Sequence, residues 1–203
     1  MDADSVEIRV LGCLIEKQRT TPDTYPLTLN SLRLACNQAT NRDPVVELGE
    51  EEIRDALQRL WRKEWTRVAS GQSSRTVKYR QLVQETLELA DDEVSILCVL
   101  MLRGPQTPGE LKQRTDRLHA FGELAEVEET LERLVVRALV VRLERRPGQK
   151  EERYAQLLGD EVDDQAEAGA LRPVLARDPL EERVAALEAE VAALRATLTD
   201  FGL

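Results

Sequence analysis

Two stretches of the chain share one change of hydrophobic period, from a one-sided helix to a β-hairpin. In the later stretch, apolar residues recur at intervals of four, three and four positions, at Val127, Leu131, Leu134 and Ala138. This spacing predicts a helix with one apolar face. Residues 139–143 and 153–157 then predict two strands around a turn at 146–150. A helix followed at once by a hairpin is typical of the recognition half of a winged helix-turn-helix.

The earlier stretch has the same pattern. Its helix carries the apolar residues Ile53, Leu57 and Leu60. Residues 66–69 and 76–82 predict the two strands, around a turn at 70–75. The three helical positions precede their counterparts in the later stretch by a constant 74 residues, which indicates an internal duplication. The predicted fold class is therefore mainly α with small β-hairpin wings. It comprises tandem winged helix-turn-helix domains over residues 1–84 and 85–158.

Each copy also has two predicted helices before its recognition helix. The first copy begins with a helix from about Asp4 to Arg19, and the second copy begins with one at Asp91 or Asp92. Residues 107–110 match a capping box, which marks the start of another helix. Pairing Val6 with Val94 gives an offset of 88 for the first helices, so the first copy would hold 14 extra residues, located within 20–44.

The C-terminal part of the chain has a different pattern. Residues 159–178 are acidic and without periodicity, which predicts a flexible linker. Over 179–203 the apolar residues alternate at four and three positions, at Leu180, Val184, Leu187, Val191, Leu194, Leu198 and Phe201. This heptad pattern favours a parallel two-stranded coiled coil and therefore a homodimer. The other interpretation is an amphipathic helix that docks on its own chain.

Charge and cysteine content narrow the function classes. The formal net charge is −10, and it divides into +1 for residues 1–84, −4 for 85–158 and −7 for 159–203. Affinity for duplex DNA comes mainly from neutralised phosphates, so any DNA binding must come from a local basic patch. The three cysteines have no metal-ligand spacing and are expected to be buried, reduced thiols. Without a signal sequence or membrane span, the protein is expected to be cytoplasmic.

Several segments resemble a known family. They are residues 20–30, 35–38, 41–45 and 103–111, with 146–149 and 153–154 in the second hairpin. Together they closely resemble the bacterial YceH-like family. The resemblance implies a tandem winged-helix fold and leaves the biochemical role open.

The residues predict a protein that is not an enzyme. His119 is the only histidine, and it is expected to be an ordinary surface or capping residue. We find no phosphate-binding glycine loop and no Cys/His metal motif, so no catalytic residue, metal or cofactor is predicted. Paired acids such as Glu128 and Glu129 lie at predicted helix starts, where carboxylates stabilise the helix dipole.

The predicted wings are basic, which favours a DNA-associated, transcription-regulator-like protein. The candidate phosphate-binding residues are Arg67, Arg75, Lys78, Arg80, Arg142, Arg145, Arg146, Lys150 and Arg153. Both recognition helices begin with several carboxylates, which oppose reading of the major groove. Contact with duplex DNA would therefore use its backbone. The alternative function is a protein-interaction or scaffold module that binds no DNA, a reading that accommodates the acidic helices directly.

A polar cluster falls in the insertion of the first copy. Its members are Tyr25, Asn37, Gln38, Asn41 and Arg42. These residues predict either a binding loop or a long loop that is held against the domain by side-chain to backbone hydrogen bonds.

Overall fold

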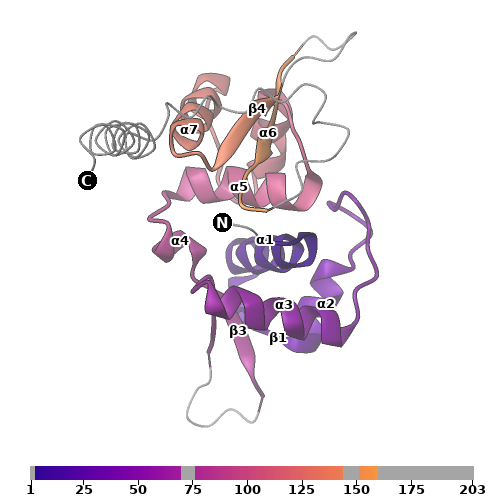
Figure 1. Cartoon of the computed structure of the whole chain (residues 1–203). Helices are drawn as coiled ribbons and strands as arrows, with labels where there is room; N and C mark the ends of the chain where they lie inside the picture. Colours follow the sequence, from indigo (N-terminus) through magenta and orange to yellow (C-terminus); the bar gives the residue numbers. More distant parts are fainter. Residues whose placement is uncertain (1–2, 70–75, 144–150, 160–203) are drawn as a thin grey trace, which may run out of the picture. The chain divides into compact units, whose positions relative to one another are not determined.

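The computed structural model describes residues 3–69, 76–143 and 151–159, which are mainly helical with small antiparallel sheets (Figure 1). The first copy contains α1 (Ser5–Thr20), a 3-10 turn (Pro22–Thr24), β1 (Leu27–Thr28), α2 (Leu29–Cys36), α3 (Glu50–Arg62), β2 (Thr66–Val68) and β3 (Lys78–Gln81). α4 (Val83–Thr86) follows. The second copy contains α5 (Asp91–Arg103), α6 (Pro108–Thr115), α7 (Leu124–Val136), β4 (Val140–Leu143) and β5 (Arg153–Gln156). The predicted fold class, helices with small β-hairpins, is confirmed for these residues.

The sheets differ between the copies. In the first copy β1, β3 and β2 form a three-stranded antiparallel sheet in that order. In the second copy β4 pairs with β5 alone. The place of the third strand is taken by a single bridge, in which the amides of Gln106 and Tyr154 donate to each other's carbonyls at 3.0 and 2.8 Å. The order helix, strand, helix, helix, hairpin thus occurs twice, the strand of the second copy being reduced to this bridge.

The C-termini of α3 and α7 repeat the same geometry. Glu64 and Ala138, 74 residues apart, both have positive φ, 60° and 53°. The next amides, those of Trp65 and Leu139, donate back to the carbonyls of Leu60 and Leu134 at 2.9 and 3.0 Å. This left-handed cap ends each helix. Ala138, predicted to lie on the helix, is therefore exposed in the cap, because α7 ends at Val136.

A buried carboxylate is also repeated, at the start of the first helix of each copy. Glu7 in α1 accepts a hydrogen bond from the N-cap amide and pairs with Lys63 at 2.7 Å. Glu93 in α5 does the same with its N-cap amide and pairs with Arg137 at 2.8 Å. The two carboxylates are 86 residues apart, whereas the two cations are 74 apart. The predicted offset of 88 for the first helices is therefore wrong, and the first copy holds 12 extra residues instead of 14.

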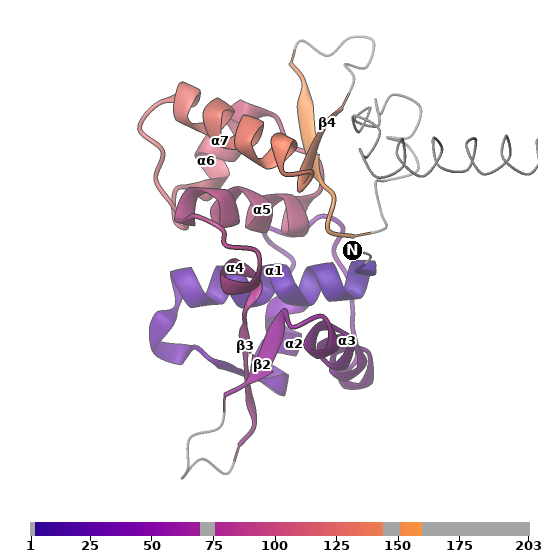
Figure 2. The same ribbon diagram turned by 60° about the vertical axis from the view of Figure 1, so that its left-hand side comes forward.

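The two copies share one hydrophobic core. α1 and α5 pack against each other (Figures 1 and 2), and every residue from Glu7 to Ile15 in α1 and from Glu93 to Leu102 in α5 is buried. Helices that are covered on all sides are typical of a domain centre. Gly12 lies at their crossing, where its carbonyl accepts from the Cys98 thiol at 3.4 Å.

The remaining predictions concern a membrane span and the C-terminal linker and coiled coil. Among the described residues, no helix has the length and apolar character needed to cross a bilayer. The predicted coiled coil and all but the first residue of the predicted linker lie outside the described residues.

Candidate nucleic-acid interface

The first hairpin brings three predicted phosphate-binding cations onto one face of its sheet. Arg67 in β2 stands directly opposite Arg80 in β3. Lys78 precedes Arg80 by two residues on the same strand, so it points to the same side. The opposite side carries Thr66 and Gln81, which are buried against the helices. The cationic face is therefore the outer face of the hairpin.

Few carboxylates neutralise this face. Arg80 pairs with Glu85 at 3.1 Å, and the Glu85 side chain is 65% exposed, so the pair is weakened by solvent. Arg67 and Lys78 make no ion pair with any other residue that the structure describes. Like charges directly across a strand pair destabilise it, and a bound anion would relieve that repulsion.

The second hairpin is different, because its described cations are already engaged. Arg142 in β4 pairs with Glu132 of α7 and lies 3.6 Å from Glu152, and its guanidinium stacks 5.6 Å from the Tyr154 ring centre. Burial opposes the charge on Arg142, but the nearby Tyr154, Glu132 and Glu152 outweigh burial and raise its pKa. Arg153 donates to the Pro105 carbonyl. These interactions leave less charge available for a phosphate than the first hairpin has.

Four of the nine predicted phosphate-binding residues lie outside the described residues, namely Arg75, Arg145, Arg146 and Lys150. The same is true of every residue in the predicted dimer interface.

The recognition helices carry the predicted acidic N-termini. In α3, Glu52 accepts from the Gly49 amide at 2.7 Å, while Glu50, Glu51 and Asp55 are exposed. In α7, the exposed acids of its N-terminal part are Glu126, Glu128, Glu129 and Glu132. These positions are where a major-groove reader would meet base edges, so the charges oppose base readout by either helix.

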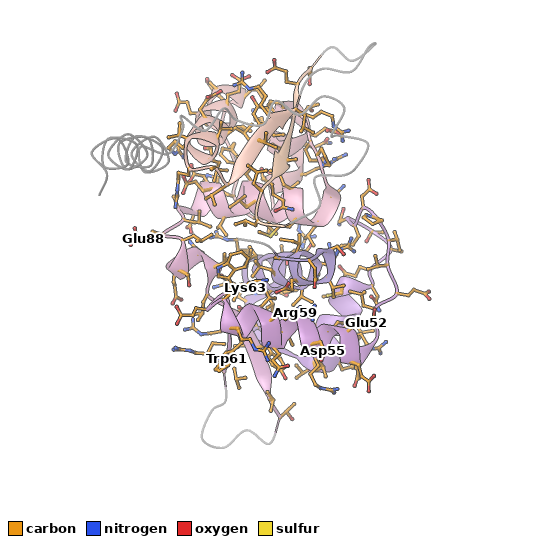
Figure 3. The ribbon with its side chains drawn as sticks, in the orientation of Figure 1. Glu52, Asp55, Arg59, Trp61, Lys63 and Glu88 are labelled. Carbon is orange, nitrogen blue, oxygen red and sulfur yellow. The ribbon has the colours of Figure 1, made fainter. Side chains whose placement is uncertain are left out.

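One exposed residue was missed by the sequence interpretation. Trp61 in the last turn of α3 is 61% exposed, whereas Trp65, three residues after α3 ends, is 2% exposed. Figure 3 shows Trp61 on the side of α3 away from Arg59 and Lys63, the two residues that pair with the start of α1. The sequence contained a signal for the exposure of Trp61. On the helix it falls just outside the apolar stripe that contains the buried Leu57 and Leu60.

The polar cluster of the insertion holds the loop in place. The Asn37 side chain exchanges two hydrogen bonds with the Leu48 backbone, both at 2.9 Å. Gln38 accepts from Lys17 at 3.3 Å and from Arg42 at 3.0 Å. These bonds match the loop-holding interpretation, and the binding-loop interpretation stays a prediction.

Tyr25 and Asn41 anchor the two ends of the insertion. The Tyr25 hydroxyl accepts from the Gln81 amide at 2.7 Å, and burial raises its pKa to about 12. Asn41 has a φ of 61° and accepts a hydrogen bond from Arg103 of the second copy. Nearby, the Asp43 amide donates to the Leu102 carbonyl at 2.9 Å. The insertion therefore joins the first copy to the C-terminal end of α5.

Arg42 is the centre of a buried ionic cluster. Its side chain is 0% exposed and donates to both Glu16 oxygens, at 3.1 and 2.7 Å. It also donates to the Ala35 carbonyl at 3.2 and 3.1 Å. Burial alone would lower the pKa of Arg42, but the hydrogen bonds and charge of Glu16 and the nearby Cys13 raise it overall. A second buried guanidinium, that of Arg9, donates to the Cys36 carbonyl at 3.2 Å.

Among the described parts of the chain there is no group of three or more His, Cys, Asp or Glu residues placed to hold a metal ion. His119 packs edge-on against Phe121, with ring centres 4.7 Å apart.

Comparisons with known proteins place these features in a family. A family profile described as "Protein of unknown function, DUF480" matches residues 3–149. The UPF0502 protein GSU0233 of Geobacter sulfurreducens is 50% identical over 196 residues, which cover 94% of this chain and 89% of that protein. The UPF0502 protein YceH of Salmonella paratyphi B is 45% identical over 201 residues, covering 96% and 93% respectively. The YceH protein of Salmonella typhimurium is similar to the same extent.

Proposed function

The chain belongs to the UPF0502 family of YceH-like proteins, and from its hairpin geometry we propose that it is a non-enzymatic, DNA-associated protein. It binds the backbone of duplex DNA through the basic outer faces of its hairpins, with the first hairpin as the main contact. The supporting observation is the cluster on one sheet face of the exposed Arg67 and the half-buried Lys78 and Arg80. Arginine and lysine side chains at such positions bind phosphate oxygens.

This mode of binding does not read bases. The exposed carboxylates at the starts of α3 and α7 repel phosphates at groove distance, each at a cost on the order of 1 kcal/mol. A basic hairpin that contacts only phosphates gives affinity without sequence preference. The protein would therefore associate with DNA in the manner of a transcription regulator or an architectural protein. Its base specificity would not come from α3 or α7.

Titration with random-sequence duplex DNA at about 50 mM salt tests this proposal. We expect binding that weakens as salt increases, because each neutralised phosphate releases counterions. Replacing Arg67 and Lys78 together by glutamine should reduce the slope of log affinity against log salt by about 2, since each lost phosphate contact contributes about 0.9. The equivalent double change of Arg145 and Arg146 should reduce it by less if the first hairpin is the main contact.

The matched control is the double change of Arg54 and Arg62 to glutamine. Both are exposed on α3, so it removes the same charge from the helix instead of the hairpin. An equal loss of slope in this control would place the contact on α3 and contradict the hairpin assignment. No complex with protein at about 50 µM would contradict DNA binding altogether, because non-specific binders reach about 10⁻⁴ to 10⁻⁶ M.

A protein-interaction or scaffold role is the second candidate, and the exposed Trp61 favours it. Tryptophan is enriched at the centres of protein interfaces, where it combines large apolar area with a hydrogen-bond donor. Acidic helix starts are also compatible with a protein partner. Under this alternative the DNA titration is negative. Replacing Trp61 by alanine then leaves folding intact, because the side chain is mostly solvent-exposed, and abolishes partner binding.

We further propose that the protein is cytoplasmic and that it forms a homodimer through residues 179–203. The heptad positions Leu180 to Phe201 support a parallel pairing of two chains. Deleting residues 178–203 should convert a dimer into a monomer in sedimentation experiments, while the circular dichroism of α1–α7 is retained. A dimer that persists after the deletion would move the interface to the described residues. A full-length monomer would instead favour docking of the helix on its own chain.

A further inference from the structure

Trp61 lies where α3 meets the first hairpin. The side chain of Thr66, at the start of β2, donates to the Leu57 carbonyl at 3.4 Å. Trp61 follows Leu57 by four residues, so it lies one turn further along the same side of α3. Figure 3 shows Trp61 on the side of α3 toward which the hairpin extends. The exposed indole therefore stands beside the base of this hairpin.

The second copy closes the equivalent place with an ion pair. Glu132 of α7 pairs there with Arg142 of β4, so a charged bridge joins the helix to its hairpin. In the first copy the residues 74 positions earlier are Gln58 and Val68, which carry no charge. The angle between α3 and β2 therefore lacks the bridge that spans the angle between α7 and β4.

Trp61 also differs from its own counterpart. The residue 74 positions later is Val135, which is partly buried and packs against the shared core. Trp61 and Val68 are both exposed, Val68 to 46%. Of the two copies, the first alone therefore presents an aromatic ring to solvent beside its hairpin.

The chain around Trp61 is basic, although the protein as a whole is acidic. Residues 56–81 contain seven arginines and lysines and a single acid, Glu64. Two of these cations pair with carboxylates at the start of α1. Arg67 in β2 is exposed and makes no ion pair with another described residue. A ligand that covers Trp61 should therefore carry negative charge.

An unpaired nucleotide fits this surface better than an acidic peptide helix does. A bound amphipathic helix needs apolar anchors along several of its turns, whereas this surface offers one large ring. A base is planar and can stack on a single aromatic side chain, while its phosphate contacts a neighbouring cation. Bases within a duplex are already stacked on each other, so only an unpaired base is free to cover the ring.

We propose that Trp61 stacks on an unpaired base of DNA, while Arg67 contacts the adjoining phosphate. This inference rests on the proposed function, because it assumes that the first hairpin contacts the DNA backbone. It names the substrate class as DNA in which a single-stranded stretch adjoins a duplex. Every base has a π-face, so stacking is tolerant of sequence. The protein thus recognises a DNA structure without reading base edges.

Two DNA probes test the inference with the full-length protein at about 50 mM salt. One is a blunt random-sequence duplex, and the other is the same duplex with a single-stranded thymidine overhang. We expect the overhang to raise the affinity about 5- to 150-fold, the equivalent of the roughly 1–3 kcal/mol that stacking of one base contributes.

Tryptophan fluorescence gives a second, direct measurement. The chain has two tryptophans, and Trp65 is 2% exposed, so quenching by a bound base reports on Trp61. The overhang probe should quench the emission, and the blunt duplex should leave it nearly unchanged. A stacked base also shields the indole, so acrylamide should quench the complex less than it quenches the free protein.

Variants assign the preference to one ring. Trp61→Ala should bind both probes with the affinity of the unmodified chain for the blunt duplex. Trp61→Phe should keep part of the preference, because phenylalanine also stacks on bases. The matched control is Val136→Ala, which removes an apolar side chain that is 85% exposed on α7. This control should keep the full preference for the overhang.

The outcomes separate this inference from the proposed function. Salt-dependent binding of both probes with equal affinity and no quenching would overturn the inference and leave the hairpin contact with DNA in place. Trp61 would then be available to the protein-interaction candidate. Binding of neither probe would overturn both proposals. A preference for the overhang that survives in Trp61→Ala would also overturn the assignment. If that variant folds poorly, quenching in the unmodified chain still decides.

Discussion

Replacement of Arg42 by alanine is expected to lower the free energy of unfolding by about 3–5 kcal/mol, the range found when one partner of a buried ion pair is removed. The change leaves Glu16 without its principal cation and the Ala35 carbonyl without its donor. The Ala35 carbonyl belongs to a buried residue and the Glu16 side chain is only 14% exposed, so leaving either without its partner is costly. The measurement is equilibrium unfolding in urea, monitored by circular dichroism.

Arg54→Ala is the control for this substitution. Arg54 is also an arginine paired with a glutamate, but the pair with Glu50 is 4.0 Å long and both side chains are more than half exposed. An exposed i, i+4 pair contributes only about 0.3–0.5 kcal/mol. If Arg42→Ala costs no more than Arg54→Ala, the buried cluster does not stabilise the insertion, and the binding-loop interpretation of Arg42 gains support.

Replacement of Gly12 by valine is expected to cost about 1–3 kcal/mol, the usual range for inserting atoms into a packed core. A Cβ at this position would lie 2.9 Å from Leu102 Cδ2 and 3.1 Å from Met101 Cβ. Leu102 and Met101 are buried in α5, so neither can move aside without disturbing the core. The substitution should therefore separate α1 from α5 and weaken the contact that unites the two copies.

Gly109→Ala is the matched glycine substitution. Gly109 lies in the first turn of α6, and an added Cβ would come no closer than 4.0 Å to a neighbouring atom. Alanine should stabilise the helix there by up to about 1 kcal/mol, because it restricts the unfolded chain more than glycine does. Equal destabilisation by the two substitutions in urea unfolding would rule out steric conflict at the α1–α5 crossing as the cause.

Local patterns were enough to find most helices and both hairpins. The capping residues Asp4 and Thr107 and the apolar stripe of Ile53, Leu57 and Leu60 lie where periodicity and capping rules predict. The rules succeed because caps and amphipathic faces depend on residues within one or two turns of each other. They fail at Ala138, because a left-handed cap on a non-glycine residue has no local signature.

The sequence identified the basic residues of the candidate site, but it did not show which other side chains surround them. The sequence shows nine basic residues on two hairpins, and it cannot show that Arg142 is paired with Glu132 and Glu152 while Arg67 is not. That difference arises because the partners come from other elements of the chain. The offset between the first helices was wrong for the same reason, since only the paired carboxylates Glu7 and Glu93 identify the equivalent positions.

The sequence by itself determined the family, the duplicated order of helices and hairpins, and the acidic character of α3 and α7, because these depend on residue type and short-range spacing. Only the tertiary structure decided that α1 and α5 form one shared core and that Arg42 is an interior residue paired with Glu16. Each of these is a contact between residues far apart in the chain. Local hydrophobic periodicity shows which face of a helix is buried, but it does not show which other helix covers that face.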